Sequence, residues 1–194
     1  LYAGAPGLTG GAPDIVKGQG TANASIFAAV SLAGGFDLAA RPDVANSTTI
    51  PHATVVATTH GGVEYYSFTV QAGETVTFDI DGASFDSTLR LFTSVGSELA
   101  NNDDGGSDNP GTDSALTHTF QFAGTYYIEV AQWITNTGST FTSGAPGAGG
   151  TYTLHVSIPS ATVVPLTQVG STLYGEDGAD TLHGGAGPDT LSGG

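Results

Sequence analysis

Alternation of apolar and polar residues is the feature that most restricts what this chain can fold into. Val76, Phe78 and Ile80 alternate with polar residues, and a tight turn at 71–74 precedes them. This period of two places one face of a strand in a core and the other face outside. The same alternation recurs in four further stretches bounded by Gly, Asn, Asp or Pro, at 85–92, 116–122, 126–133 and 152–158.

Short strands separated by turns roughly every 8–12 residues are typical of a two-sheet protein. No amphipathic helix of useful length competes with about seven or eight such strands. The sequence therefore predicts an all-β fold, namely an antiparallel, jelly-roll-like β-sandwich. No apolar run reaches the length of about 18 residues that a membrane span requires.

The glycine and proline residues divide the chain into segments. Residues 1–20 carry Gly or Pro every few positions, which predicts an extended arm or linker. We expect the sandwich at 21–158, with a long flexible loop at 136–150 interrupting its last hairpin. A linker with two prolines at 159–170 precedes a repetitive tail at 171–194.

The tail repeats with a period of nine. Residues 175–183 and 184–192 follow the pattern GGxGxDxUx, in which U is a large apolar residue, with Glu176 in place of one Gly, and Gly193 and Gly194 begin a third copy. Glycine permits positive φ and exposes carbonyl groups, aspartate supplies hard oxygen ligands, and the apolar residue fills a narrow core. The candidate calcium ligands here are Gly178, Asp180, Gly187 and Asp189.

This pattern resembles the calcium-binding nonapeptide repeat of RTX proteins. The resemblance implies a parallel β-roll in which each ion lies between one turn and the turn two repeats later. The third turn ends before its Asp, so we expect the incomplete repeat either to continue in a longer protein or to borrow a neighbouring chain. The resemblance also implies type I secretion with folding triggered by external calcium. The alternative is a disordered, glycine-rich acidic tail.

The charge of the chain excludes several partners. There are 18 acidic residues against three basic ones, which gives a net charge of −15. Nucleic acid and anionic lipid surfaces need clustered Lys and Arg, so we expect no nucleic-acid binding and no membrane insertion. Cysteine is absent, which excludes disulfides and thiolate metal sites. Such a composition suits a secreted, extracellular bacterial protein.

An acidic segment at 101–113 is the second candidate calcium site. It holds four Asp and three Asn with no basic residue, and calcium binds six to eight such oxygen ligands. It is not an EF-hand, because Ser114 stands where the twelfth-position Glu would fall. The alternative is an ordinary hairpin turn. The candidate ligands are Asp103, Asp104, Asp108 and Asp113.

Several phrases in the strand region resemble a known family. They are "IPHATV", "YYSFTVQAGETVTFDI", "FDSTLRLFTSVGSELANNDD" and "AGTYYIEV". They are similar to the bacterial pre-peptidase C-terminal domain, a β-sandwich accessory module related in fold to the collagen-binding modules of clostridial collagenases. The resemblance covers 22–158 and implies a module attached to secreted proteins. It also makes Asp86 either a further metal ligand or a turn-capping carboxylate.

Three aromatic residues fall on the strand phase opposite to the core residues. Phe92, Tyr127 and Trp133 are therefore candidate ligand-binding residues, which could grip an apolar or sugar surface if solvent reaches them. The alternative is that loops or the arm cover them. The same phase argument places Asp79, Asp81 and His155 on the outward side of their strands, where we expect Asp79 and Asp81 to be solvated.

The sequence offers no catalytic constellation. Its five histidines form no HExxH motif, and neither a G-x-S-x-G elbow nor a phosphate-binding loop with lysine is present. We therefore expect no enzyme activity and no catalytic residues in this segment.

These observations predict a secreted, calcium-binding accessory module for binding or display of an extracellular protein or polysaccharide. One alternative is a self-assembling structural subunit whose arm adds as a strand to another copy. A second alternative is the C-terminal portion of a secreted peptidase or other hydrolase.

Overall fold

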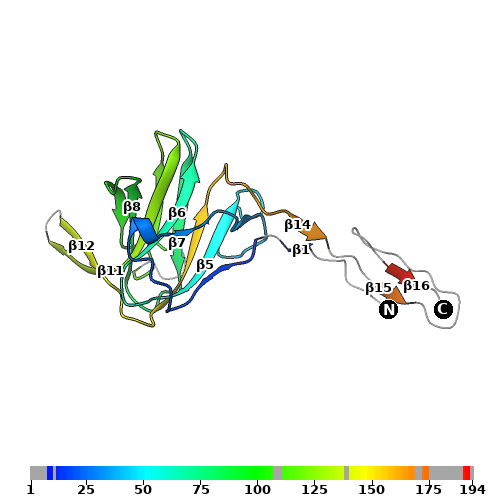
Figure 1. The fold of residues 1–194 in the computed structure, drawn as a ribbon, viewed down its shortest axis with the longest axis horizontal. Coiled ribbons are helices and arrows are strands. Elements are labelled where there is room, and N and C mark those ends of the chain that lie inside the picture. Colours follow the sequence, from blue (N-terminus) through cyan, green and yellow to red (C-terminus); the bar gives the residue numbers. More distant parts are fainter. Residues whose placement is uncertain are drawn as a thin grey trace.

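A computed structural model describes residues 8–10, 12–106, 111–137, 140–168, 172–174 and 190–192. Within these residues the chain is all-β, as predicted, with one 3-10 turn, η1 (Ile26–Ala28). Most of the strands form two sheets that pack face to face, and the remaining described strands form two separate two-stranded pairs (Figure 1). No helix among the described residues is long and apolar enough to cross a membrane.

The first sheet of the sandwich holds six strands in the described part of the chain. Their spatial order is β10 (Ala115–Thr119), β7 (Thr75–Asp81), β13 (Thr151–Ser157), β5 (His52–Thr58) and β2 (Ile15–Lys17), with β4 (Phe36–Asp37) also on β5. All pairs are antiparallel except β2 with β5.

The second sheet also holds six strands among the described residues. Their order is β3 (Val30–Ser31), β6 (Glu64–Val70), β11 (Gly124–Thr137), β8 (Ser87–Thr93) and β9 (Glu98–Asn102), with β12 (Thr140–Gly144) on β11. Only β3 pairs in parallel, with β6.

The core lies between the two sheets and confirms the alternation read from the sequence. Phe78 and Ile80 of one sheet and Leu91 and Ile128 of the other are fully buried. The ring of Phe68 packs 5.2 Å from that of Phe78, centroid to centroid. Each large apolar side chain buried in this way contributes about 1.5–3 kcal/mol to folding, which makes the sandwich the main source of stability.

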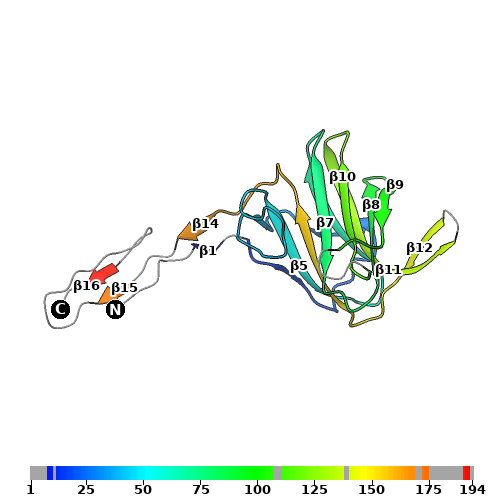
Figure 2. The ribbon, with the colours of Figure 1, turned by 180° about the vertical axis from the view of Figure 1, so that it is seen from behind.

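The expected loop at 136–150 is wrong in its first part. β11 continues to Thr137 and pairs with β12 in an antiparallel hairpin, with a register irregularity between Trp133 and Thr135. Figures 1 and 2 show this hairpin projecting from the body of the sandwich. Threonine-rich sequence pairs well in a sheet once an extended partner strand is available, although Gly and Ser around it predict a loop.

The arm expected at 1–20 also needs correction, because part of it belongs to the sandwich. β2 adds to β5 in the first sheet, with Val16 opposite Val56. Further upstream, β1 (Leu8–Gly10) pairs with β14 (Leu166–Gln168), which lies in the expected linker. β1 and β2 are each three residues long, which is too short for an alternation pattern to reveal them.

Candidate calcium sites

The tail forms a parallel strand pair whose register matches the nonapeptide repeat. β15 (Thr172–Tyr174) pairs with β16 (Thr190–Ser192), so that Leu173 lies opposite Leu191. The two leucines are 18 positions apart, which is two repeats of nine. This is the pairing expected of a roll in which every second strand lies on the same side. The candidate ligands Gly178, Asp180, Gly187 and Asp189 lie outside the described residues.

The acidic segment between β9 and β10 is closed at its base by hydrogen bonds. The backbone N–H of Gly106 donates to the carbonyl of Asp113 at 2.7 Å. The side-chain amide of Asn102 donates to the carbonyls of Asp104 (2.9 Å) and Ala115 (2.7 Å). A Cβ on Gly106 would lie only 2.6 Å from that of Asp113, so this close approach requires glycine. Asp108 lies outside the described residues.

Three of the predicted ligands, Asp86, Asp103 and Asp104, approach one another where the acidic segment leaves β9. Leu89 of β8 lies opposite Asn102 of β9, so Asp86, which precedes β8, comes close to Asp103 and Asp104, which follow β9. Burial and then the negative charges of Asp104 and Asp103 raise the pKa of Asp86. A divalent cation bound among these carboxylates would relieve this repulsion.

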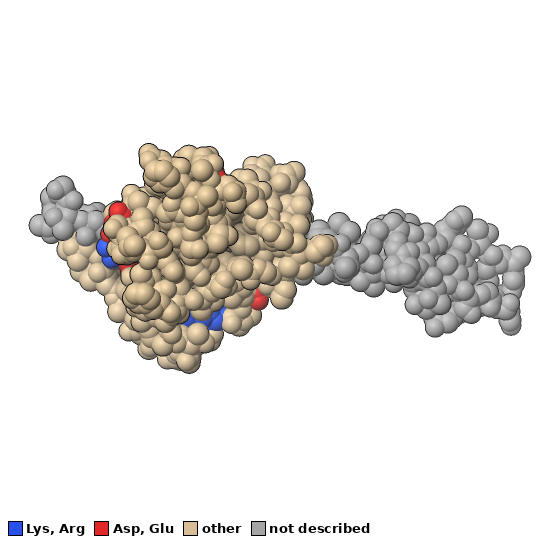
Figure 3. All heavy atoms as spheres, turned by 45° about the horizontal axis from the view of Figure 1, so that its top comes forward, with Lys and Arg blue, Asp and Glu red and all other residues tan. Residues whose placement is uncertain are grey.

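The lysine and arginine side chains contact acidic residues outside this cluster. The three basic residues of the chain form ion pairs elsewhere: Lys17 with Glu64, Arg41 with Asp14, and Arg90 with Glu98 and Glu129. Figure 3 shows one face of the molecule with few charged side chains and no large basic patch. In the part of the chain that the structure describes, no three acidic or histidine side chains converge tightly enough to hold a metal alone.

Asp113 has a structural role that the sequence analysis missed. Its carboxylate is buried and accepts hydrogen bonds from the backbone N–H groups of Gly82 (2.9 Å) and Ala83 (3.0 Å). Each oxygen therefore caps the turn that follows β7. Both carboxylate oxygens of Asp113 therefore accept backbone N–H groups of this turn.

The three candidate aromatic residues do not form an open platform. Phe92 is buried between the ring of Tyr65, 5.9 Å away, and the guanidinium of Arg90, 5.1 Å above its centroid. Tyr127 and Trp133 are half-buried. Phe92 is therefore covered, but by the strand residues Tyr65 and Arg90 and not by loops or the arm.

The outward phase of the first sheet is covered as well. His155 is buried, with Nδ1 at 3.0 Å from the hydroxyl oxygen of Thr54 and Nε2 at 3.1 Å from Oδ2 of Asp81, which is also buried. A small cavity separates His155 from the segment 43–50, which crosses this face. The prediction that Asp81 is solvated is therefore wrong, whereas Asp79 is partly exposed.

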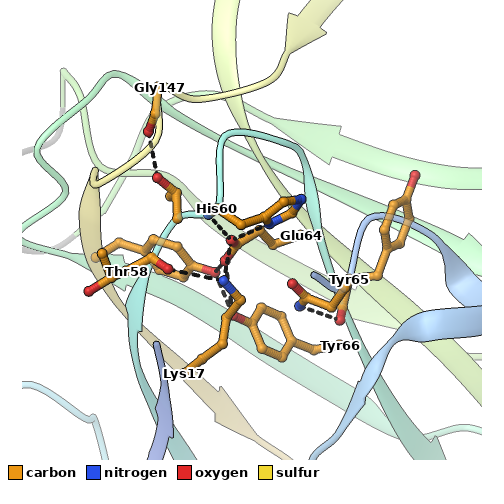
Figure 4. Close-up of polar contacts among 10 residues, drawn as sticks. Lys17, Thr58, His60, Glu64, Tyr65, Tyr66 and Gly147 are labelled. Carbon is orange, nitrogen blue, oxygen red and sulfur yellow. Dashed lines mark hydrogen bonds and ion pairs between the residues drawn. The ribbon is translucent and has the colours of Figure 1, made fainter. Parts of the chain in front are cut away.

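A further polar cluster lies inside the sandwich, around the carboxylate of Glu64 (Figure 4). Oε1 contacts the ammonium of Lys17 and accepts the backbone N–H of His60 at 3.1 Å. Oε2 accepts the hydroxyl of Tyr152 at 2.6 Å. The sequence does indicate this cluster, because Glu64 and Tyr66 are two residues apart in a strand and therefore point to the same face. The hydroxyl of Tyr66 lies 2.5 Å from that of Tyr152.

The fold and the tail together define a β-sandwich module followed by a calcium-binding repeat. Residues 62–132 match the family model of the bacterial pre-peptidase C-terminal domain. Residues 171–194 match the family model of the RTX calcium-binding nonapeptide repeat, which describes four copies. Both are non-catalytic modules, and the repeat identifies calcium as the cofactor.

No curated protein matches the chain. Among solved structures, it is similar to PliG of Aeromonas hydrophila, a periplasmic inhibitor of g-type lysozyme, with 16% identity and a TM-score of 0.38. That match covers 75% of this chain and 99% of the inhibitor. PliG of Salmonella Typhimurium matches with 17% identity over 57% of this chain and 87% of its own, at a TM-score of 0.33.

Proposed function

We propose that this chain is a non-catalytic, calcium-stabilised accessory module of an extracellular protein exported by type I secretion. Its role is the binding or display of a protein or polysaccharide outside the cell. The observation that carries the proposal is the parallel pairing of Leu173 with Leu191, two nonapeptides apart. RTX repeats are typical of such exported proteins, and the sandwich supplies the accessory module.

Calcium binds at two places in this proposal. One is the tail, through Asp180 and Asp189 with the carbonyls of Gly178 and Gly187. The other is the acidic segment, through Asp86, Asp103, Asp104 and Asp108. The raised pKa of Asp86 supports the second site, because after burial its causes are the negative charges of the nearby Asp104 and Asp103.

The single tryptophan allows the second site to be tested separately from the first. The backbone N–H of Trp133 donates to the carbonyl of Asp86 at 2.9 Å, and the tail contains no Trp. We expect calcium to change the Trp133 emission and to raise the melting temperature of the full chain. Asp103→Asn with Asp104→Asn should abolish the emission change.

The matched control is the tail double variant Asp180→Asn with Asp189→Asn. It should bind fewer calcium ions by isothermal titration while the Trp133 response persists. If calcium leaves the emission and the melting temperature of the unmodified chain unchanged, the acidic segment is only a turn. If the tail variant binds as many ions as the unmodified chain, the tail site is wrong.

A second candidate function is self-assembly into an extracellular structure. The observation that favours it is the placement of the N-terminal strand β2 at the edge of the first sheet, where an equivalent strand from another copy would make the same hydrogen bonds. Light scattering against concentration tests it, and a strict monomer at every concentration would contradict it.

A further inference from the structure

The N-terminal strand β2 presents two side chains to the interior and one to solvent. Ile15 packs against the core, and Lys17 is 3% exposed, whereas Val16 between them is 78% exposed. A Cβ on Gly35 would lie 2.8 Å from the Cδ1 of Ile15, so this glycine leaves the room that Ile15 fills. The surroundings of β2 therefore fit the two side chains that point inward, Ile15 and Lys17.

The inward pocket recognises an ammonium group. Nζ of Lys17 contacts Oε1 of Glu64 and donates to the carbonyl of Thr58 at 3.0 Å. Glu64 is fully buried, and its carboxylate is held by groups that do not belong to β2, the backbone N–H of His60 and the hydroxyl of Tyr152. Figure 4 shows Lys17 and His60 converging on the carboxylate of Glu64. The pocket is therefore preorganised by β5, β6 and β13.

Lys17 is also the only lysine of the chain, and the two arginines are engaged with other acids. The sequence Ile-Val-Lys at 15–17 is thus the one segment of this protein that fits the pocket. A buried carboxylate that loses its cationic partner is strongly destabilising, so the pocket has to be filled in the folded state.

The attachment of β2 to the rest of its own chain is weak by comparison. It is a three-residue edge strand, and it leads into Gly18 and Gly20, where a Cβ would have no neighbour within 4 Å. The ion pair of Asp14 with Arg41 just before it is partly exposed, and pairs of that kind contribute about 0–1 kcal/mol. Its connection to η1 and β3 crosses from the edge of one sheet to the edge of the other.

We propose that the pocket formed by Glu64, Tyr152 and the carbonyl of Thr58 accepts the N-terminal strand of a second copy of this chain in exchange for its own, an inference that rests on the self-assembly function proposed above. An exchanged strand makes the same contacts as the original, so the balance depends on protein concentration and on the geometry of the glycine linker. Reciprocal exchange gives closed dimers, and successive exchange gives open chains. The inference does not depend on either calcium site.

The absence of cysteine allows a direct test in the full chain. Val16 and Val56 lie opposite each other in the β2–β5 pair, and both are exposed, at 78% and 42%. Chains carrying Val16→Cys and chains carrying Val56→Cys are unfolded in urea, mixed, refolded together and oxidised with glutathione disulfide. Exchange should produce a disulfide-linked heterodimer whose yield rises with total protein concentration.

Two controls separate exchange from random collision. Val95→Cys lies in an exposed turn, so pairing it with Val16→Cys measures random cross-linking. The chain with both Val16→Cys and Val56→Cys should cross-link internally and remain a monomer. A heterodimer yield several-fold above the Val95 control supports exchange, and a yield equal to that control at every concentration overturns it.

The lysine pocket has its own test. Adding Lys17→Met to the Val16→Cys chain should lower the heterodimer yield several-fold, whereas adding Thr9→Ala, in β1, should not. An unchanged yield with Lys17→Met overturns the assignment of Glu64 as the recognition group. Because the first comparison uses only exposed positions, it remains decisive if the Lys17 variant folds poorly.

Discussion

Lys17 and Glu64 form a buried ion pair although 47 positions separate them in the chain. The pair joins the N-terminal strand β2 to the start of β6, and Glu64 also accepts the hydroxyl of Tyr152 from β13. Burial and the neighbouring Tyr66 and Glu64 raise the pKa of Tyr152, so its hydroxyl remains a donor. One cluster therefore links three segments of the sandwich.

Removing the ammonium group from this cluster should be costly. We expect Lys17→Met to lower the free energy of unfolding by about 3–5 kcal/mol, because it leaves a buried carboxylate without its cation. Lys17→Met combined with Glu64→Gln should recover part of the loss. Urea unfolding measures both, with exposed Val16→Ala as the control at less than about 0.5 kcal/mol. A loss as small as that of the control would contradict the buried pair.

The reactivity of the only lysine should report how often β2 detaches. Since Lys17 is buried, an amine-specific reagent should label it about 100-fold more slowly in the folded chain than in the same chain unfolded in urea. Mass spectrometry of labelled peptides measures both rates. Equal rates would mean that β2 is detached for most of the time.

Acidification should destabilise the fold through His155. Burial, followed by the positive charge of Arg41 and His52, lowers its pKa to about 4, although Asp43 and Asp14 act in the opposite direction. The unfolded chain, with a histidine pKa near 6.5, binds the proton more readily between these values, so stability rises with pH across that window. His155 should contribute about 1–3 kcal/mol above pH 6.5, lost progressively towards pH 4.

Urea unfolding across this pH range, in the presence of chelator, measures the effect. His155→Gln should flatten the dependence between pH 4 and 6.5, while His118→Gln, at a half-exposed position, should leave it unchanged. The assignment fails if the His155 variant keeps the slope of the unmodified chain.

Asp113 should behave as a cap and not as a calcium ligand. Asp113→Ala leaves the backbone N–H groups of Gly82 and Ala83 without their acceptor, which should cost about 1–3 kcal/mol. The calcium response of Trp133 should persist at higher calcium. Disappearance of the response at saturating calcium, in a chain that remains folded, would return Asp113 to the metal site.

Gly106 should tolerate no side chain, in contrast to its neighbour Gly111. Gly106→Ala places a Cβ within 2.8 Å of the Asp113 backbone, which should destabilise the chain by about 1–3 kcal/mol. Gly111 has no neighbour within 4 Å of that position, so Gly111→Ala serves as the control, with little or no loss. Thermal unfolding compares the two, and equal melting temperatures would contradict the tight base of the segment.

The strands that carry the core were predictable because each alternates over five or more residues. β7 and β13 are examples, in which Val76, Phe78, Leu154 and Val156 face the core as expected. The three-residue strand β2 was not predictable, because its parallel partner β5 lies far along the chain. The alternation of side chains along a strand does, however, place Ile15 and Lys17 on the same face.

Alternation predicted correctly which side chains point away from the core, but it did not predict how far they are exposed to solvent. His155 and Asp81 point away from the core, as alternation predicts, but 43–50 crosses over His155. Phe92 likewise lies outside the core and is covered by Tyr65 and Arg90. Alternation identifies the face of a sheet on which a side chain lies. What packs on that face depends on contacts distant in sequence.

The sequence also identified the carboxylates of the acidic segment as candidate metal ligands. It could not show which of them has a structural role instead. Asp103, Asp104 and Asp113 look equivalent in a run of Asp, Asn and Gly. Only the position of the turn after β7 shows that Asp113 binds two backbone N–H groups there.

Every lysine and arginine side chain of the protein forms an ion pair, and this affects how readily proteases cleave the folded chain. Proteases of the trypsin type cut after lysine or arginine in extended, accessible backbone. Lys17 is buried, Arg41 is followed by Pro42, and Arg90 lies in β8 between two neighbouring strands with its guanidinium bonded to Glu98 and Glu129. The folded chain therefore presents such proteases with no readily cleaved bond, as a consequence of the same ion pairs that hold the sandwich together.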